Sequence, residues 1–233
     1  MLCFWLPSLA AASEVVSARY ADPTDRYPHG VLGDPSEYTT LEVRTSDGKL
    51  HRRTWERPIV YEDTAPRLVD VDGDGAPEVI VVQSHEDRGA QFEILTLRQG
   101  KLESLVSNPF IGTRFRWLAI VGAADLDGDG FVEIAYVDRP HLARTLRVWR
   151  IIPAADGAAR VEEIASLEGV TNHRIGEVDI AGGIRDCGSG PEMIVADARW
   201  GRVLGVSFDS GRLVSRDVGA HRGRSSFAEA MAC

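Results

Sequence analysis

The sequence predicts an all-β fold, because its apolar residues fall in short runs that are separated by turn residues. The chain has 233 residues, of which 23 are glycine, so tight turns are frequent. A helical apolar period is expected only near the C-terminus, where residues 225–232 predict one or two turns. The length fits one large domain or two small ones, and all-β domains of this size are commonly single.

Four similar segments divide the chain into repeats. The segments PHGVLGD, PEVIVVQ, VEIAYVD and PEMIVAD begin at Pro28, Pro77, Val132 and Pro191, about 50 to 60 residues apart. Each is followed by a second apolar segment that contains a turn, at Leu41, Phe92, Leu146 and Leu204. We expect repeats at about 14–64, 65–116, 117–175 and 176–219, followed by a C-terminal tail at 220–233.

Each repeat is expected to form four short strands. In the second repeat these strands are expected at 67–72, 77–83, 91–98 and 101–107. Four-stranded units at this period predict a small β-propeller of about four four-stranded blades. An irregular β-sandwich is the alternative, but it would not require the repeat.

Two loops between the first and second strands carry the same acidic pattern, D-x-D-G-D-G-x-x-E. The carboxylates at alternate positions can turn inward around one ion, the glycines allow the tight reversal, and the backbone carbonyl at position 7 can add a ligand. Such hard oxygen donors select Ca²⁺, so we expect about two calcium ions. The predicted ligands are Asp70, Asp72, Asp74, Ala76 and Glu78 in one loop, and Asp125, Asp127, Asp129, Phe131 and Glu133 in the other.

The spacing differs from that of an EF-hand, whose glutamate stands at position 12 between two helices. An Asp/Gly-rich hairpin without an ion is the alternative interpretation, and the repetition of the pattern in register argues against it. The same position is degenerate in the outer repeats, where Asp25 remains in the first and Asp186 and Glu192 in the fourth. We predict no ion there.

The two acidic loops resemble the FG-GAP or VCBS-type repeats of integrin-like β-propellers. The resemblance covers about residues 14 to 219 and is strongest between 65 and 150. It implies an extracellular protein that binds a carbohydrate or protein ligand. Rings of this family are usually larger, so four units leave it open whether the ring closes alone or pairs with another copy.

The remaining loops predict a ligand site at the other edge of the blades. Strand direction alternates within a blade, so the loops between strands 2 and 3 and between blades lie opposite the acidic loops. They collect arginine, histidine and tryptophan, which suit anionic groups and sugar rings. The alternative is that these arginines pair with neighbouring carboxylates. The candidate ligand residues are Arg114, Arg116, Arg139, His141, His173, Arg174, Arg199 and Trp200.

Motifs of the common enzyme classes are largely absent from the sequence. It contains no G-x-S-x-G, no H-E-x-x-H and no phosphate loop. A binding or interaction module is therefore the favoured function, with an anionic carbohydrate or a protein as the partner. A lyase or hydrolase that acts on an acidic glycan is the alternative, and a scaffold for another protein is a third possibility.

Composition and the termini predict an exported protein. The net charge is −9, which disfavours nucleic acid as a partner. No apolar run reaches the length that spans a bilayer, so an integral membrane protein is not expected. Residues 2–12 are apolar and end in Ala10-Ala11-Ala12, which predicts a signal peptide at 1–12 and a periplasmic or secreted protein. No basic residue precedes this run, so the start could lie upstream, or the run could be a strand.

The cysteines agree with export. Cys3 lies in the predicted signal peptide, which leaves Cys187 and Cys233 as an even pair. We expect a disulfide between them, with two unrelated thiols as the alternative.

Overall fold

A computed structural model of the chain describes residues 13–33 and 36–233, and the regular secondary structure in these ranges is almost entirely β-strand. The predicted signal peptide and Cys3 lie outside the described residues. In the described part the strands are β1 (Val15–Thr24), β2 (Glu37–Thr45), β3 (Leu50–Thr54), β4 (Ile59–Tyr61), β5 (Arg67–Val69), β6 (Glu78–His85), β7 (Gly89–Arg98), β8 (Lys101–Ser107), β9 (Leu118–Ala124), β10 (Glu133–Asp138), β11 (Thr145–Pro153), β12 (Ala159–Glu168), β13 (Val170–Thr171), β14 (Gly183–Asp186), β15 (Pro191–Asp197), β16 (Arg202–Asp209) and β17 (Arg212–Ala220).

The strands form antiparallel sheets of consecutive strands. Strands β9 to β12 make a four-stranded sheet, and β13 to β17 make a five-stranded sheet in which β13 and β14 both pair with β15. The remaining strands form one sheet, because β4 pairs with both β2 and β6 and thereby joins two antiparallel units. The arrangement is that of a β-propeller-like fold with strongly twisted meanders.

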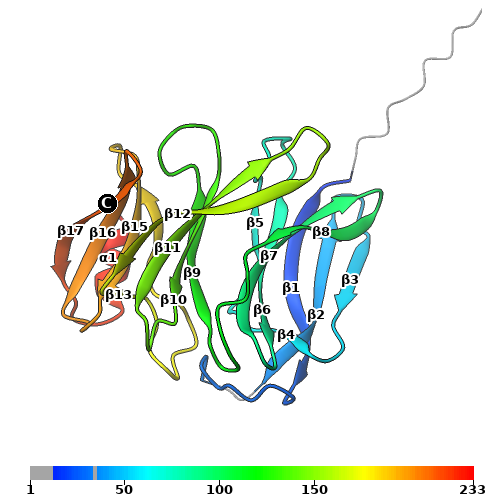
Figure 1. Cartoon of the computed structure of the whole chain (residues 1–233), viewed down its shortest axis with the longest axis horizontal. Helices are drawn as coiled ribbons and strands as arrows, with labels where there is room; N and C mark the ends of the chain where they lie inside the picture. The colour runs from blue at the N-terminus through cyan, green and yellow to red at the C-terminus, as the bar shows by residue number, and fades with distance from the viewer. Residues whose placement is uncertain (1–12, 34–35) are drawn as a thin grey trace, which may run out of the picture.

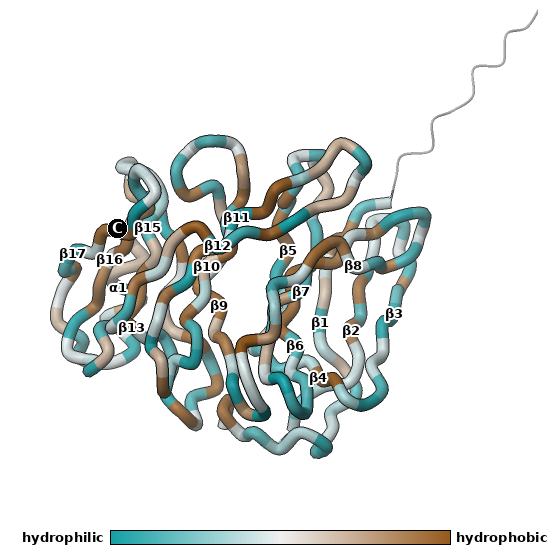
Figure 2. Tube along the Cα trace, in the orientation of Figure 1, coloured by the Kyte–Doolittle hydropathy of each residue, from teal (hydrophilic) through white to brown (hydrophobic). Residues whose placement is uncertain are grey.

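The sheets stand side by side along the long axis of the molecule (Figure 1). Strands β1 to β3 lie at one end, and β15 to β17 lie at the other with the C-terminus. Apolar clusters fill the space between neighbouring sheets; in one of them Phe92 and Tyr136 of two adjacent sheets meet edge to face. Figure 2 shows hydrophobic residues along many of the strands and hydrophilic residues at most loop tips.

Strand positions in the second, third and fourth repeats agree with the sequence-based expectation. The four strands β5 to β8 coincide with those predicted for the second repeat to within a few residues. The predicted C-terminal turns form the helix α1 (Ser225–Met231), whose Phe227 and Ala230 are buried. The part of the chain that the structure describes holds no helix of the length and hydropathy needed to cross a bilayer.

The first repeat differs from its prediction. The segment that begins at Pro28 was expected to be a strand, but the described residues 28–33 form a turn, and the first strand lies earlier, at Val15–Thr24. Pro28 cannot donate to a sheet ladder, and Gly30 and Gly33 have φ of 64° and 92°, which is not strand geometry. The first repeat therefore contributes β1 and the hairpin strands β2 and β3. Strand β4 pairs with β6 and so extends the strands of the second repeat.

Candidate functional site

The two acidic loops fold alike at the same edge of the sheets. They connect β5 to β6 and β9 to β10, and both lie at the upper edge in Figure 1. The equivalent glycines have nearly equal φ, 77° and 90° at Gly73 and Gly75 and 78° and 89° at Gly128 and Gly130. These left-handed conformations favour glycine. The repeated glycine pattern therefore sets the same loop path twice.

The carboxylates of the first loop turn inward, as the spacing predicts. Asp70 accepts hydrogen bonds from the amides of Gly73 and Gly75 at 2.8 and 2.9 Å. Glu78 closes the loop by accepting from the amide of Val71 at 3.0 Å. Oxygens of Asp70, Asp72 and Glu78 lie within 4.8 Å of one another.

This oxygen set fits a metal ion. Glu78 is buried, and burial raises its pKa to about 7, with the nearby Asp72 adding to the shift. A divalent cation at the cluster would offset the cost of holding these carboxylates together. Asp74 lies outside the three-carboxylate group and accepts from the amide of Ala76 at 2.8 Å.

The second loop has the same acidic group but also holds an internal cation. Oxygens of Asp125, Asp127 and Glu133 lie within 4.8 Å of one another. The guanidinium of Arg150 in β11 pairs with Asp127 at 2.8 Å, Asp129 at 2.6 Å and Glu133 at 2.5 Å. In the first loop Thr96 stands in place of this arginine, and its hydroxyl donates to Glu78 at 3.2 Å. The two loops therefore differ by one positive charge.

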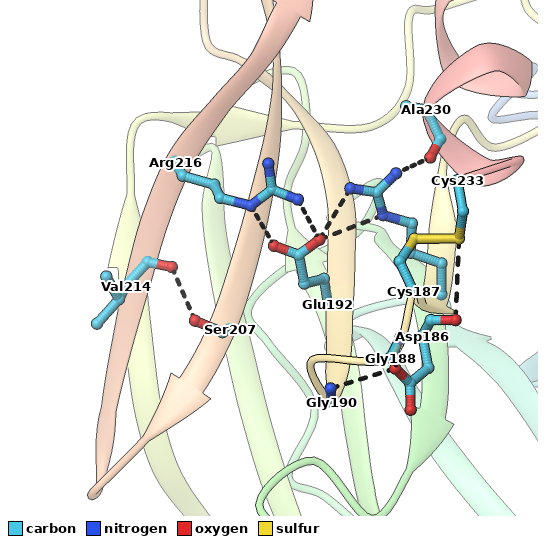
Figure 3. Close-up of polar contacts among 11 residues, drawn as sticks. Asp186, Cys187, Gly188, Gly190, Glu192, Ser207, Val214, Arg216, Ala230 and Cys233 are labelled. Atoms are coloured by element: carbon cyan, nitrogen blue, oxygen red, sulfur yellow. Dashed lines mark hydrogen bonds and ion pairs between the residues drawn. A yellow bond between two sulfur atoms is a disulfide. The ribbon is translucent and has the colours of Figure 1, made fainter.

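The fourth repeat replaces the acidic loop by arginines and a cross-link (Figure 3). Glu192 accepts from Arg185 at 2.9 Å and from Arg216 at 2.5 and 2.6 Å. Cys187 and Cys233 form the expected disulfide, with an S–S distance of 2.08 Å. The bond ties this loop to the residues that follow α1.

Two adjoining cavities lie at the opposite edge of the sheets, which we call the basic edge. One has a volume of about 280 Å³ and is lined by His29, Phe115, Arg116, Trp117, Arg139, Pro140, His141, Leu142 and Ile175. The second also measures about 280 Å³ and is lined by Pro140, His141, Arg144, His173, Arg174, Ile175 and Trp200. They share Pro140, His141 and Ile175, and among the described residues no carboxylate lines either one.

The structure brings six of the eight candidate ligand residues to these cavities. Arg116, Arg139 and His141 line the first cavity, and His141, His173, Arg174 and Trp200 line the second. Arg174 lies over the ring of Trp200, 4.2 Å from its centre, and 3.9 Å from Glu177. The other two candidates line neither cavity: Arg114 lies over Phe115, at 4.8 Å, and Arg199 is exposed.

Sequence reasoning missed His29, Phe115 and Trp117 as cavity residues. His29 belongs to the loop after β1, which was interpreted as a degenerate acidic loop, and it reaches the cavity by stacking on Phe115 at 4.9 Å. Its Nδ1 is 2.5 Å from Glu62, a fully buried carboxylate that also accepts from Ser84. The pair is 33 positions apart, so no local pattern marks it.

Comparison with known protein families identifies one part of the chain. Residues 61–136 match the model of the FG-GAP-like repeat. The match begins at β4 and contains both acidic loops, so the resemblance inferred from those loops is confirmed there, and the chain carries an FG-GAP-like repeat. A search of curated proteins finds no match to the chain.

Proposed function

We propose that the protein is an exported, calcium-binding β-propeller of four blades that serves as an interaction module for an anionic carbohydrate. Calcium bound by the acidic loops would hold the turns between the first and second strands, and the cavities of the basic edge would bind the ligand. The protein ligand considered above remains the alternative partner.

One observation carries the ligand assignment. Carboxylates gather in the loops of one edge, whereas the cavities at the other edge are lined by arginine, histidine and aromatic residues without a carboxylate among the described residues. On a chain of net charge −9, the basic and aromatic cavities of the basic edge attract anions locally, while the rest of the surface repels them. Phe115 and Trp200 add aromatic walls to the two cavities. Arg174 lies over the Trp200 ring, and His29 and Arg114 lie against the Phe115 ring.

Support for calcium and export comes from separate features. The inward-turned oxygens of the first loop match a hard divalent ion. The disulfide between Cys187 and Cys233 suits an oxidising compartment such as the periplasm.

The test is a binding screen on the full chain with calcium present. Oligomers of uronic acids, sulfated oligosaccharides, neutral oligosaccharides and acidic peptides are compared by isothermal titration at two salt concentrations. We expect binding to acidic saccharides that weakens as salt rises, because exposed charge attraction is screened. Binding that is confined to neutral sugars or to peptides would reject the proposal, and turnover of an acidic saccharide would favour the enzymatic alternative.

A further inference from the structure

The first cavity of the basic edge has the size of a site for a single ring rather than for a long chain. Its volume of about 280 Å³ is near the lower end of the range for small-molecule sites. Trp117 forms a buried wall, Phe115 is partly buried, and Leu142 and Ile175 at the rim are 62% and 71% exposed. The cavity therefore offers an apolar rim and partly apolar walls to a ring that enters from solvent.

Two arginines of this cavity are available to an anionic group. Arg116 forms no ion pair with any described residue. Arg139 is held in place by Asp138, which accepts from its Nε at 2.7 Å and from its Nη2 at 2.9 Å, and its Nη1 has no partner among the described residues. A fixed guanidinium and a second one without an ion pair among the described residues line the same cavity, which suits a carboxylate because it accepts two hydrogen bonds at once.

A chain of hydrogen bonds defines the proton positions on the histidines. The carbonyl of Glu177 accepts from His173 Nε2 at 2.8 Å, and His173 Nδ1 is 3.0 Å from His141 Nε2. Because a carbonyl only accepts, neutral His173 carries its proton on Nε2, and His141 Nε2 donates to His173 Nδ1. Burial and the neighbouring His173 lower the pKa of His141 to about 4, which keeps its ring neutral. His141 Nδ1 is thus an unprotonated acceptor for a hydroxyl.

A second buried contact fixes His29 in the wall of the first cavity. Glu62 accepts from Ser84, lies 2.5 Å from His29 Nδ1 and is fully buried. This contact orients the imidazole against Phe115 and leaves its Nε2 as the nitrogen without a partner among the described residues.

The backbone also marks this region. Phe115 and Arg139 of the first cavity have φ of 62° and 46°, and Arg144 and Trp200 of the second have φ of 53° and 58°. Side chains of this size rarely adopt the left-handed region, and such residues cluster at ligand sites.

From these contacts we infer that the first cavity binds one uronic acid unit, with the carboxylate on Arg116 and Arg139 and a hydroxyl on His141 Nδ1. The assignment rests on the proposed function, because it names the sugar class that the basic edge recognises. His29 is a positioning residue that supports Phe115. A sulfated sugar would meet the same arginines, and it is one of the alternatives that the test decides.

The probe is a tetramer of galacturonic acid, compared with its methyl ester, which removes the charge and keeps the ring. We expect the acid to bind at least tenfold more tightly than the ester. Arg116→Ala should weaken binding of the acid at least tenfold. Arg199→Ala is the matched control, because it removes an arginine outside both cavities, and it should change the affinity less than twofold.

The outcomes separate the two proposals. Equal affinity for acid and ester, or equal loss in Arg116→Ala and Arg199→Ala, overturns the cavity assignment while the interaction module stands. Tighter binding of a sulfated tetrasaccharide than of the uronate overturns the sugar class. No binding of any acidic saccharide rejects both proposals. Because Arg116 has no ion-pair partner in the described residues, its replacement should leave the melting temperature unchanged, which excludes unfolding as the cause.

Discussion

Replacing Arg150 by threonine is expected to strengthen calcium binding at the second acidic loop. The guanidinium pairs with Asp127, Asp129 and Glu133 at 2.5 to 2.8 Å, so an entering cation must share or displace these oxygens. Thr96 shows that a neutral side chain is tolerated at the corresponding place in the first loop.

The size of the effect follows from charge repulsion. Two unit charges about 4 Å apart interact by about 1 kcal/mol in bulk water and about 4 kcal/mol at an effective dielectric of 20. A divalent ion doubles these values, and the exposure of Asp127 and Asp129 places the loop near the aqueous end. Removing the guanidinium should therefore favour calcium by about 2 kcal/mol, which is about a 30-fold decrease in Kd.

The assay is calcium titration of EDTA-treated protein by calorimetry. The wild-type protein should show one tighter and one weaker site, and Arg150→Thr should show two of similar affinity. The reciprocal variant Thr96→Arg should weaken calcium binding at the first loop by a similar factor. Asp72→Ala should abolish calcium binding at the first loop and Asp127→Ala at the second, so the two variants assign each heat signal to a loop. Equal wild-type sites together with no change in Arg150→Thr would refute the reasoning.

Three further outcomes are expected. Reduction of the Cys187–Cys233 disulfide, or Cys233→Ser, should lower the free energy of unfolding by up to about 4 kcal/mol, because the bond closes a loop with a separation of 46 residues. Coinciding denaturation curves for the oxidised protein and for the reduced or substituted protein would contradict this. The pKa of His141 is about 4 when folded and about 6.5 in an unfolded chain, so the unfolded state binds more protons between these values. The free energy of unfolding should therefore fall as pH drops from ~6.5 toward ~4, by at most about 1.4 kcal/mol per pH unit for this one group. His141→Gln should flatten the slope of unfolding free energy against pH, and equal slopes would speak against this assignment. Asp72→Ala should abolish one calcium site, whereas Asp186→Ala should leave calcium binding intact, because the described partners of the Asp186 carboxylate are the amides of Gly188 and Gly190 in its own loop. Loss of a site in the second variant would show that the fourth repeat binds an ion.

Local sequence predicts the acidic loops well because their geometry is encoded within nine residues. The glycines adopt the left-handed conformations that the pattern requires, and the first aspartate and the final glutamate accept the loop amides. Arg150 was missed because it follows Glu133 by 17 positions on the next strand. The pairing of Glu133 with Arg150 in the β10–β11 register brings them together, and such a register is not visible in the loop itself.

Long-range contacts limited the prediction of the basic edge and of the first repeat. Alternation of strand direction was enough to assign most of the arginine and histidine loops to one edge. It could not show that His29, from a different repeat, reaches Phe115 and contacts the buried Glu62. The strand Val15–Thr24 was misplaced because most of its residues are exposed or half-buried, so it lacks the apolar alternation that marks the other strands.

A glutamate at or near the start of the strand after each loop explains why the loops of the second, third and fourth repeats keep the same place in the fold but use different groups to balance its charge. Glu78 and Glu133 each accept the amide of the residue after the first aspartate, so the carboxylate closes the loop and is buried as a result. A buried negative charge needs a compensating cation. In the fourth repeat Arg185 and Arg216 provide it, and in the third Arg150 does so. In the second repeat Glu78 has only the Thr96 hydroxyl and the Val71 amide as described partners, which makes this loop the one whose charge balance most requires an ion from solution.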